Sequence, residues 1–195
     1  MEEKTYTLEG WLAIVSGCLV LPGMVMAILA DTAFAHFGGF KLLWLIVSGI
    51  QMGLSIYVFY RFRDFLHDRF QFHAVDTLIP LIIAGSCLIF IILSAGRIVT
   101  TPEEIRLKIL FIIALVLVGI PTSILGIIFA VKLLGLPDNL HGLLKPYAYL
   151  TIISMVFFLT IILGFLGAIV AAVTDILLGM IYLRSNRPPD EVEFV

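Results

Sequence analysis

The sequence predicts an all-α protein, a polytopic bundle of helices embedded in a membrane, and three observations carry this prediction. The chain is 61% hydrophobic and 13% charged, whereas soluble domains are about 45–50% apolar and about 25% charged. Its mean hydropathy is +1.13. Five runs of 19 to 29 residues contain no Asp, Glu, Lys or Arg, and they cover residues 10–30, 42–60, 77–96, 109–131 and 146–174.

These runs have the length that a membrane requires. A hydrocarbon core about 30 Å thick is crossed by about 20 helical residues. The connecting segments are too short to fold as soluble domains, so residues 1–184 are expected to form a single transmembrane domain. The first four runs predict one helix each, at about 9–30, 41–60, 77–97 and 106–132.

The last apolar stretch leaves two alternatives open. A continuous helix over residues 147–183 would be about 55 Å long, nearly twice the thickness of the hydrocarbon core. It either projects from the bilayer as one long fifth span, or it folds into a hairpin at Gly164–Gly167. The hairpin gives a fifth span at about 147–163 and a sixth at about 168–184.

The distribution of basic residues favours six spans. With six spans, 8 of the 12 Lys and Arg residues fall on the side of the two termini and 4 on the other side, whereas five spans give no bias. Basic residues accumulate on the cytoplasmic side of membrane proteins. We therefore predict six transmembrane helices in a cell inner or plasma membrane, with both termini in the cytoplasm.

The segment that follows the second run combines aromatic and charged residues. Phe59, Phe62, Leu66 and Phe70 recur at helical spacing, with charges elsewhere around the helix. This pattern predicts an amphipathic helix that lies at the membrane interface and dips its apolar side chains into the bilayer. Its basic residues are then expected to contact anionic lipid headgroups, and they are Arg61, Arg63 and Arg69.

The same segment offers candidate metal ligands in Asp64, His67, Asp68 and His73. Their spacing matches no known metal-binding signature. The neighbouring arginines offer ion-pair partners for the carboxylates instead. We therefore predict charge pairing at the interface and no metal site.

Two polar side chains inside the predicted spans are candidate functional residues. Gln51 lies within Gly49–Gly53, a GxxxG sequence that permits close helix contact, either within the bundle or between copies of the chain. Asp175 lies inside the last span, where a carboxylate is costly and usually faces a partner or a cavity. It is a candidate for proton or cation handling, or for a hydrogen bond to Ser, Thr or Tyr. Asp76, just before the third span, is expected to cap that helix.

No catalytic residue or cofactor site is predicted. The sequence lacks HExxH, CxxC, P-loop and Gly-x-Ser-x-Gly motifs. A net charge of −2 argues against nucleic-acid binding, which requires a basic surface. The residues 185–195 contain two prolines and three acids and are expected to form a disordered acidic tail.

Taken together, these features favour a non-catalytic accessory, scaffold or assembly subunit that acts through helix–helix and lipid contacts. Its expected partners are the lipid bilayer, other membrane proteins or a second copy. The alternative is a small-solute or ion transporter or channel that works as a homo-oligomer, with helix kinks at Pro22 and Pro121 and with Asp175 near its pathway.

Overall fold

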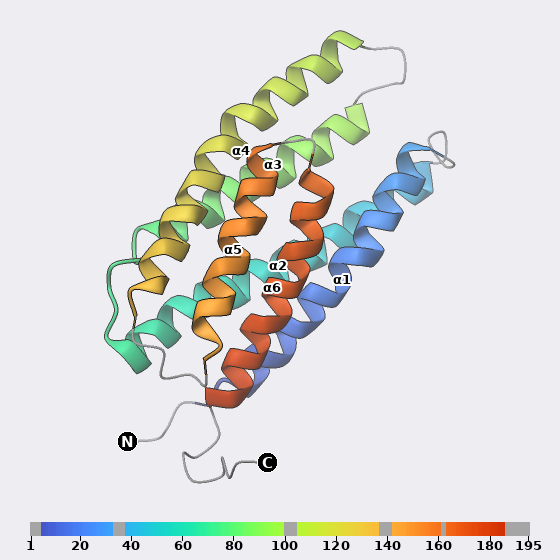
Figure 1. The fold of residues 1–195 in the computed structure, drawn as a ribbon. Coiled ribbons are helices and arrows are strands. Elements are labelled where there is room, and N and C mark those ends of the chain that lie inside the picture. The colour runs from blue at the N-terminus through green and yellow to red at the C-terminus, as the bar shows by residue number, and fades with distance from the viewer. Residues whose placement is uncertain (1–4, 33–37, 100–104, 137–141, 161–162, 186–195) are drawn as a thin grey trace.

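The computed structural model describes residues 5–32, 38–99, 105–136, 142–160 and 163–185. Within these ranges the chain forms six helices and no strand (Figure 1). The prediction for the acidic tail lies outside the described residues, apart from Ser185. The helices are α1 (Thr7–Asp31), α2 (Gly38–Phe70), α3 (Leu78–Val99), α4 (Ile105–Leu134), α5 (Leu144–Leu159) and α6 (Gly164–Ser185).

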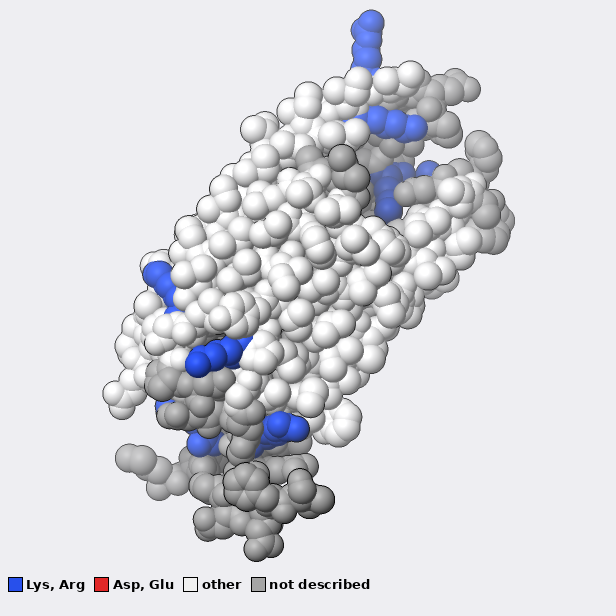
Figure 2. Space-filling model, in the orientation of Figure 1, with Lys and Arg blue, Asp and Glu red and all other residues white. Residues whose placement is uncertain are grey.

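The predicted fold class, a helical membrane bundle, is confirmed. Five of the helices are long and apolar enough to cross a membrane: α1, α2, α3, α4 and α6. On the face drawn in Figure 2, Lys and Arg gather toward the two ends of the molecule and leave a broad uncharged band between them. Such a band suits the hydrocarbon core of a bilayer.

Helix α5 is shorter than the others, at 16 residues. This corresponds to about 24 Å, less than the hydrocarbon thickness of about 30 Å. In Figure 1 the facing ends of α5 and α6 accordingly lie below the upper ends of α3 and α4.

The last apolar stretch folds into two helices, so the alternative with one long fifth helix is wrong. The predicted position of the turn is also wrong, because α5 ends at Leu159 and Gly164 already begins α6. Gly167 serves close packing instead of a turn. A Cβ atom there would lie 3.2 Å from the carbonyl oxygen of Ser154, whose hydroxyl donates a 2.9 Å hydrogen bond to the Gly167 carbonyl.

The helices form a ring in which each packs against its neighbour in the chain and α6 returns to pack along α1. Glycines allow this closure. A Cβ atom on Gly179 would lie 2.6 Å from the carbonyl oxygen of Gly10, and one on Gly17 would lie 2.6 Å from that of Ala172. Because α1 starts where α6 ends, both lie at what we call the terminal end of the bundle.

The core of the bundle is an aromatic cluster near the terminal end. Phe62, Phe65 and Leu66 of α2 are fully buried. The Phe62 ring meets Tyr147 of α5 at 5.4 Å between centroids, and the Phe65 ring meets Tyr182 of α6 at 5.3 Å. Edge-to-face contacts of this kind stabilise aromatic clusters beyond simple burial.

This cluster overturns the predicted interfacial helix. The residues 59–70 continue α2 and their apolar face packs against other helices of the bundle. The periodicity of Phe59, Phe62, Leu66 and Phe70 correctly indicated one apolar face. It could not indicate whether lipid or protein covers that face, because both offer an apolar environment.

Candidate functional site

A partly buried ion pair joins α1 and α2 at the terminal end. Glu9 of α1 is 4% exposed. The Arg61 Nε donates to Glu9 Oε1 at 3.0 Å, while its Nη1 donates to Asp64 Oδ2 at 3.1 Å. One guanidinium therefore holds two carboxylates, a geometry that its planar fork of donors permits.

Tyr6 extends this network ahead of α1. Its hydroxyl donates a 2.5 Å hydrogen bond to Asp68 Oδ2, and the Arg61 guanidinium lies 5.9 Å from the centre of its ring. Burial, followed by the hydrogen bond to Asp68, raises the pKa of the Tyr6 hydroxyl well above its ordinary value. The phenol therefore remains a donor throughout the physiological pH range.

The other two arginines of this segment also have partners inside the chain. Arg63 stacks over the Tyr60 ring at 4.5 Å and contacts Asp64 at 3.5 Å. Arg69 donates a 2.6 Å hydrogen bond to the carbonyl oxygen of Ser185, at the end of α6. Lipid contact by Arg61, Arg63 and Arg69 stays a prediction, and each of them also serves the packing of the terminal end.

The opposite end of the bundle is joined by a cation–π contact. The Arg97 guanidinium of α3 lies 4.1 Å from the centre of the Trp44 ring of α2, and Trp44 is 7% exposed. Lys41 donates a 3.4 Å hydrogen bond to the Arg97 carbonyl oxygen. These contacts connect α2 to α3 far from the terminal end.

Between the two ends, a polar chain crosses three helices. Ser16 of α1 donates a 3.1 Å hydrogen bond to Asp175 Oδ2 of α6, and its oxygen lies 2.7 Å from the Ser55 hydroxyl of α2. Asp175 is half-buried. The structure thus gives this carboxylate a serine partner, one of the two environments considered from the sequence. Gln51 of α2 is not part of this chain of hydrogen bonds. Its side-chain oxygen faces Gly23 of α1, where an added Cβ atom would lie 3.7 Å from it.

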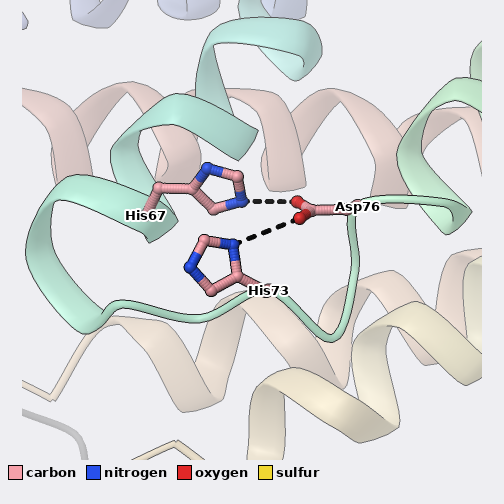
Figure 3. Close-up of side chains that lie close together, drawn as sticks. All are labelled: His67, His73 and Asp76. Atoms are coloured by element: carbon pink, nitrogen blue, oxygen red, sulfur yellow. Dashed lines mark hydrogen bonds and ion pairs between the residues drawn. The ribbon is translucent and has the colours of Figure 1, made fainter.

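A third polar group lies where α2 turns into α3 (Figure 3). Both oxygens of the Asp76 carboxylate face imidazoles. His67 Nε2 bonds to Oδ1, and His73 Nδ1 lies 3.2 Å from Oδ2. The two rings lie 4.4 Å apart. Desolvation, the largest contribution, raises the pKa of Asp76, but the bonds to the two histidines outweigh it and hold the pKa below its usual value.

This group differs from the ligand set considered in the sequence. Asp64 and Asp68 bond to Arg61 and Tyr6 instead, so the structure brings together the two histidines alone from that set. Asp76, expected to cap the third helix, faces the histidines. The sequence does place His73 three residues before Asp76. That spacing indicates a contact between their side chains only once the path of the turn between α2 and α3 is known.

Comparison of the chain with protein-family models, with curated proteins and with solved structures finds no match.

Proposed function

We propose that this chain is a non-catalytic membrane scaffold or accessory subunit, and that it self-associates through the outward face of α2. The observation that carries the proposal is Gly53, where an added Cβ atom would meet nothing within 4 Å. Of the five long helices, α2 also has the smallest buried share in its most apolar stretch. A long helix so little covered by its own bundle has surface available for another helix.

The residues around Gly53 suit helix packing. The exposed positions follow a spacing of three and four residues, which places them in one stripe. Small residues within such a stripe let two backbones approach closely in a bilayer, where van der Waals packing drives association. The stripe consists of Leu43, Ile46, Ile50, Gly53, Tyr57 and Tyr60.

A second copy of the chain is the proposed occupant. A two-fold interface uses the same patch on both subunits, so that patch must complement itself. The stripe meets this condition because the gap at Gly53 lies between the large side chains of Ile50 and Tyr57, and the same side chains of a second copy can enter it. Residues 42–60 carry no charge that would oppose such pairing.

The test compares Gly53→Val with Gly119→Val. Gly119, on α4, likewise has nothing within 4 Å of an added Cβ atom, so both variants should fold like the native chain. Labelled protein is reconstituted at low density in lipid vesicles, and photobleaching steps are counted for single molecules. We expect two steps for the native chain and Gly119→Val, and one step for Gly53→Val. A native chain that bleaches in one step would overturn self-association.

A second candidate function, transport of a small solute or ion, rests on Asp175. A half-buried carboxylate that shares a hydrogen-bonded chain with Ser16 and Ser55 could pass protons or bind cations at membrane depth. Proteoliposomes should then show proton or cation flux that Asp175→Asn abolishes. Ser94→Ala is the matched control, because the buried Ser94 hydroxyl lacks a hydrogen-bond partner. Absence of flux in the native chain would reject this candidate.

A further inference from the structure

Three side chains at the turn between α2 and α3 form hydrogen bonds with one another and are also of the types that bind metal ions. We propose that His67, His73 and Asp76 form a binding site for a divalent transition-metal ion of the zinc type. Each residue can offer one ligand atom, and the three atoms lie within 4.8 Å of one another. Figure 3 shows the two imidazoles and the carboxylate converging on one small region.

The distances suit coordination after small side-chain movements. Zinc binds histidine nitrogen at about 2.0–2.1 Å and carboxylate oxygen at about 2.0–2.2 Å, so tetrahedral ligands lie about 3.4 Å apart. His73 Nδ1 and Asp76 Oδ2 are 3.2 Å apart already. The direct bond between His67 and Asp76 must open by rotation of their side chains to admit the ion. Coordination then replaces that hydrogen bond.

The backbone fixes the three positions relative to one another. Gln71 adopts a left-handed conformation with φ of 50°, which ends α2 and reverses the chain. Its N–H donates to the His67 carbonyl oxygen at 3.0 Å, and the Asp76 N–H donates to the His73 carbonyl oxygen at 3.2 Å. The second bond joins two proposed ligand residues directly, and the first holds His67 to the residue that begins the turn.

The turn is also anchored to the rest of the bundle. Val75 is fully buried in the core. Lys132 Nζ of α4 donates a 2.7 Å hydrogen bond to the Ala74 carbonyl oxygen. A ligand set held on an anchored turn loses less conformational freedom when it binds an ion than one on a mobile loop.

The ligand types indicate which ions fit. Two imidazole nitrogens and one carboxylate oxygen suit zinc and its neighbours, whereas calcium and magnesium prefer oxygen ligands throughout. The His67, His73 and Asp76 side chains are 28%, 69% and 37% exposed, so an ion can enter from solvent. Water can complete the coordination, and the ion would clamp the last turn of α2 to the start of α3.

The proposal does not depend on self-association or transport, and Zn²⁺ alone tests it. Protein purified without a histidine tag is titrated with Zn²⁺ by calorimetry in detergent, with Mg²⁺ and Ca²⁺ in parallel. We expect about one Zn²⁺ per chain and no binding of Mg²⁺ or Ca²⁺. His73→Ala should weaken Zn²⁺ binding by at least about tenfold, because losing a residue that merely supports a ligand already costs about 10–100-fold.

Controls separate this site from unspecific binding to histidines. His141→Ala removes a histidine that is not one of the three proposed ligands, and this variant should bind Zn²⁺ like the native chain. His73 is largely exposed, so His73→Ala should keep the native circular dichroism without metal. The visible absorption of added Co²⁺ provides a second readout, since tetrahedral nitrogen and oxygen ligands intensify it. Equal Zn²⁺ binding by the native chain and His73→Ala, or no binding by the native chain, would overturn the proposal.

Discussion

Tyr6 and Asp68, separated by 62 positions in the chain, are joined by a 2.5 Å hydrogen bond that connects the start of α1 to the end of α2. The Tyr6 ring also stacks against Tyr182 of α6, with centroids 5.8 Å apart. One side chain thus joins three helices at the terminal end.

Replacing Tyr6 by Phe should destabilise the bundle. The ring contacts remain while the donor to Asp68 is lost, and a hydrogen bond to a charged group contributes about 1.5–3 kcal/mol. Unfolding by SDS in mixed micelles measures the change in the free energy of unfolding. Tyr149→Phe, at a 56% exposed position on α5, should change it little, and equal effects of the two substitutions would contradict the role of this bond.

Arg61→Lys should also lower the free energy of unfolding, although the charge is kept. A lysine ammonium lacks the fork of donors that reaches Glu9 and Asp64 together. Breaking a buried ion pair costs about 3–5 kcal/mol, and the 34% exposure of the Arg61 side chain reduces this to about 1–2 kcal/mol. Arg184→Lys at an exposed position is the control, measured by the same SDS titration.

Two glycine substitutions should act in opposite directions. Gly179→Ala places a methyl group 2.6 Å from the Gly10 carbonyl oxygen and should cost about 1–3 kcal/mol. Gly119→Ala meets nothing and should stabilise its helix by about 0.5–1 kcal/mol. Thermal melting in detergent distinguishes them. Two shifts of the same sign would show that the contact between α1 and α6 is looser than described.

The Asp76 carboxylate should contribute to stability in a pH-dependent way. Its pKa is lowered in the folded protein, so the unfolded chain takes up the proton first as the pH falls. The contribution is therefore fully present above the unfolded pKa of about 3.8 and is lost as the pH falls through the folded pKa. Melting temperatures from pH 7 down to pH 2 should fall more steeply for the native chain than for Asp76→Asn, with most of the difference below about pH 4. Parallel curves would count against the interaction.

Cysteine labelling should place the terminal end on one side of the membrane. In a chain with Cys18 and Cys87 replaced by Ala, we introduce Thr5→Cys, Ala74→Cys and Thr32→Cys at exposed positions. The first two lie at the terminal end and the third at the opposite end. An impermeant maleimide added outside intact cells should react with Thr32→Cys alone if the termini face the cytoplasm. Reaction of Thr5→Cys and Ala74→Cys instead would reverse the proposed orientation.

Much of the fold could be predicted because the absence of charge over a span is a strong signal. The uncharged runs identified the helices, and the excessive length of 147–183 correctly suggested two of them. The turn was misplaced because Gly164 and Gly167 resemble turn residues. Gly167 in fact lies where α6 approaches Ser154 of α5 closely, and one sequence does not distinguish a glycine that turns from one that packs.

The polar sites were less predictable, since they depend on contacts between distant segments. Glu9 gave no local indication that it would be buried against Arg61. The grouping of His67, His73 and Asp76 depends on Gln71, whose left-handed conformation is uncommon for a residue other than glycine. Asp175, in contrast, could be identified from the sequence because it is a carboxylate inside a long apolar stretch.

The closure of the ring by α6 has a consequence for biogenesis. Helix α1 enters the membrane long before α6 is synthesised, and until then its glycine face and Ser16 lack the contacts that α6 supplies. Glu9 and Ser16 can meanwhile use Arg61 and Ser55, which α2 brings soon afterwards. The α1–α2 pair can thus form hydrogen bonds between its own polar groups before the later helices are made. The arrival of α6 then completes the bundle.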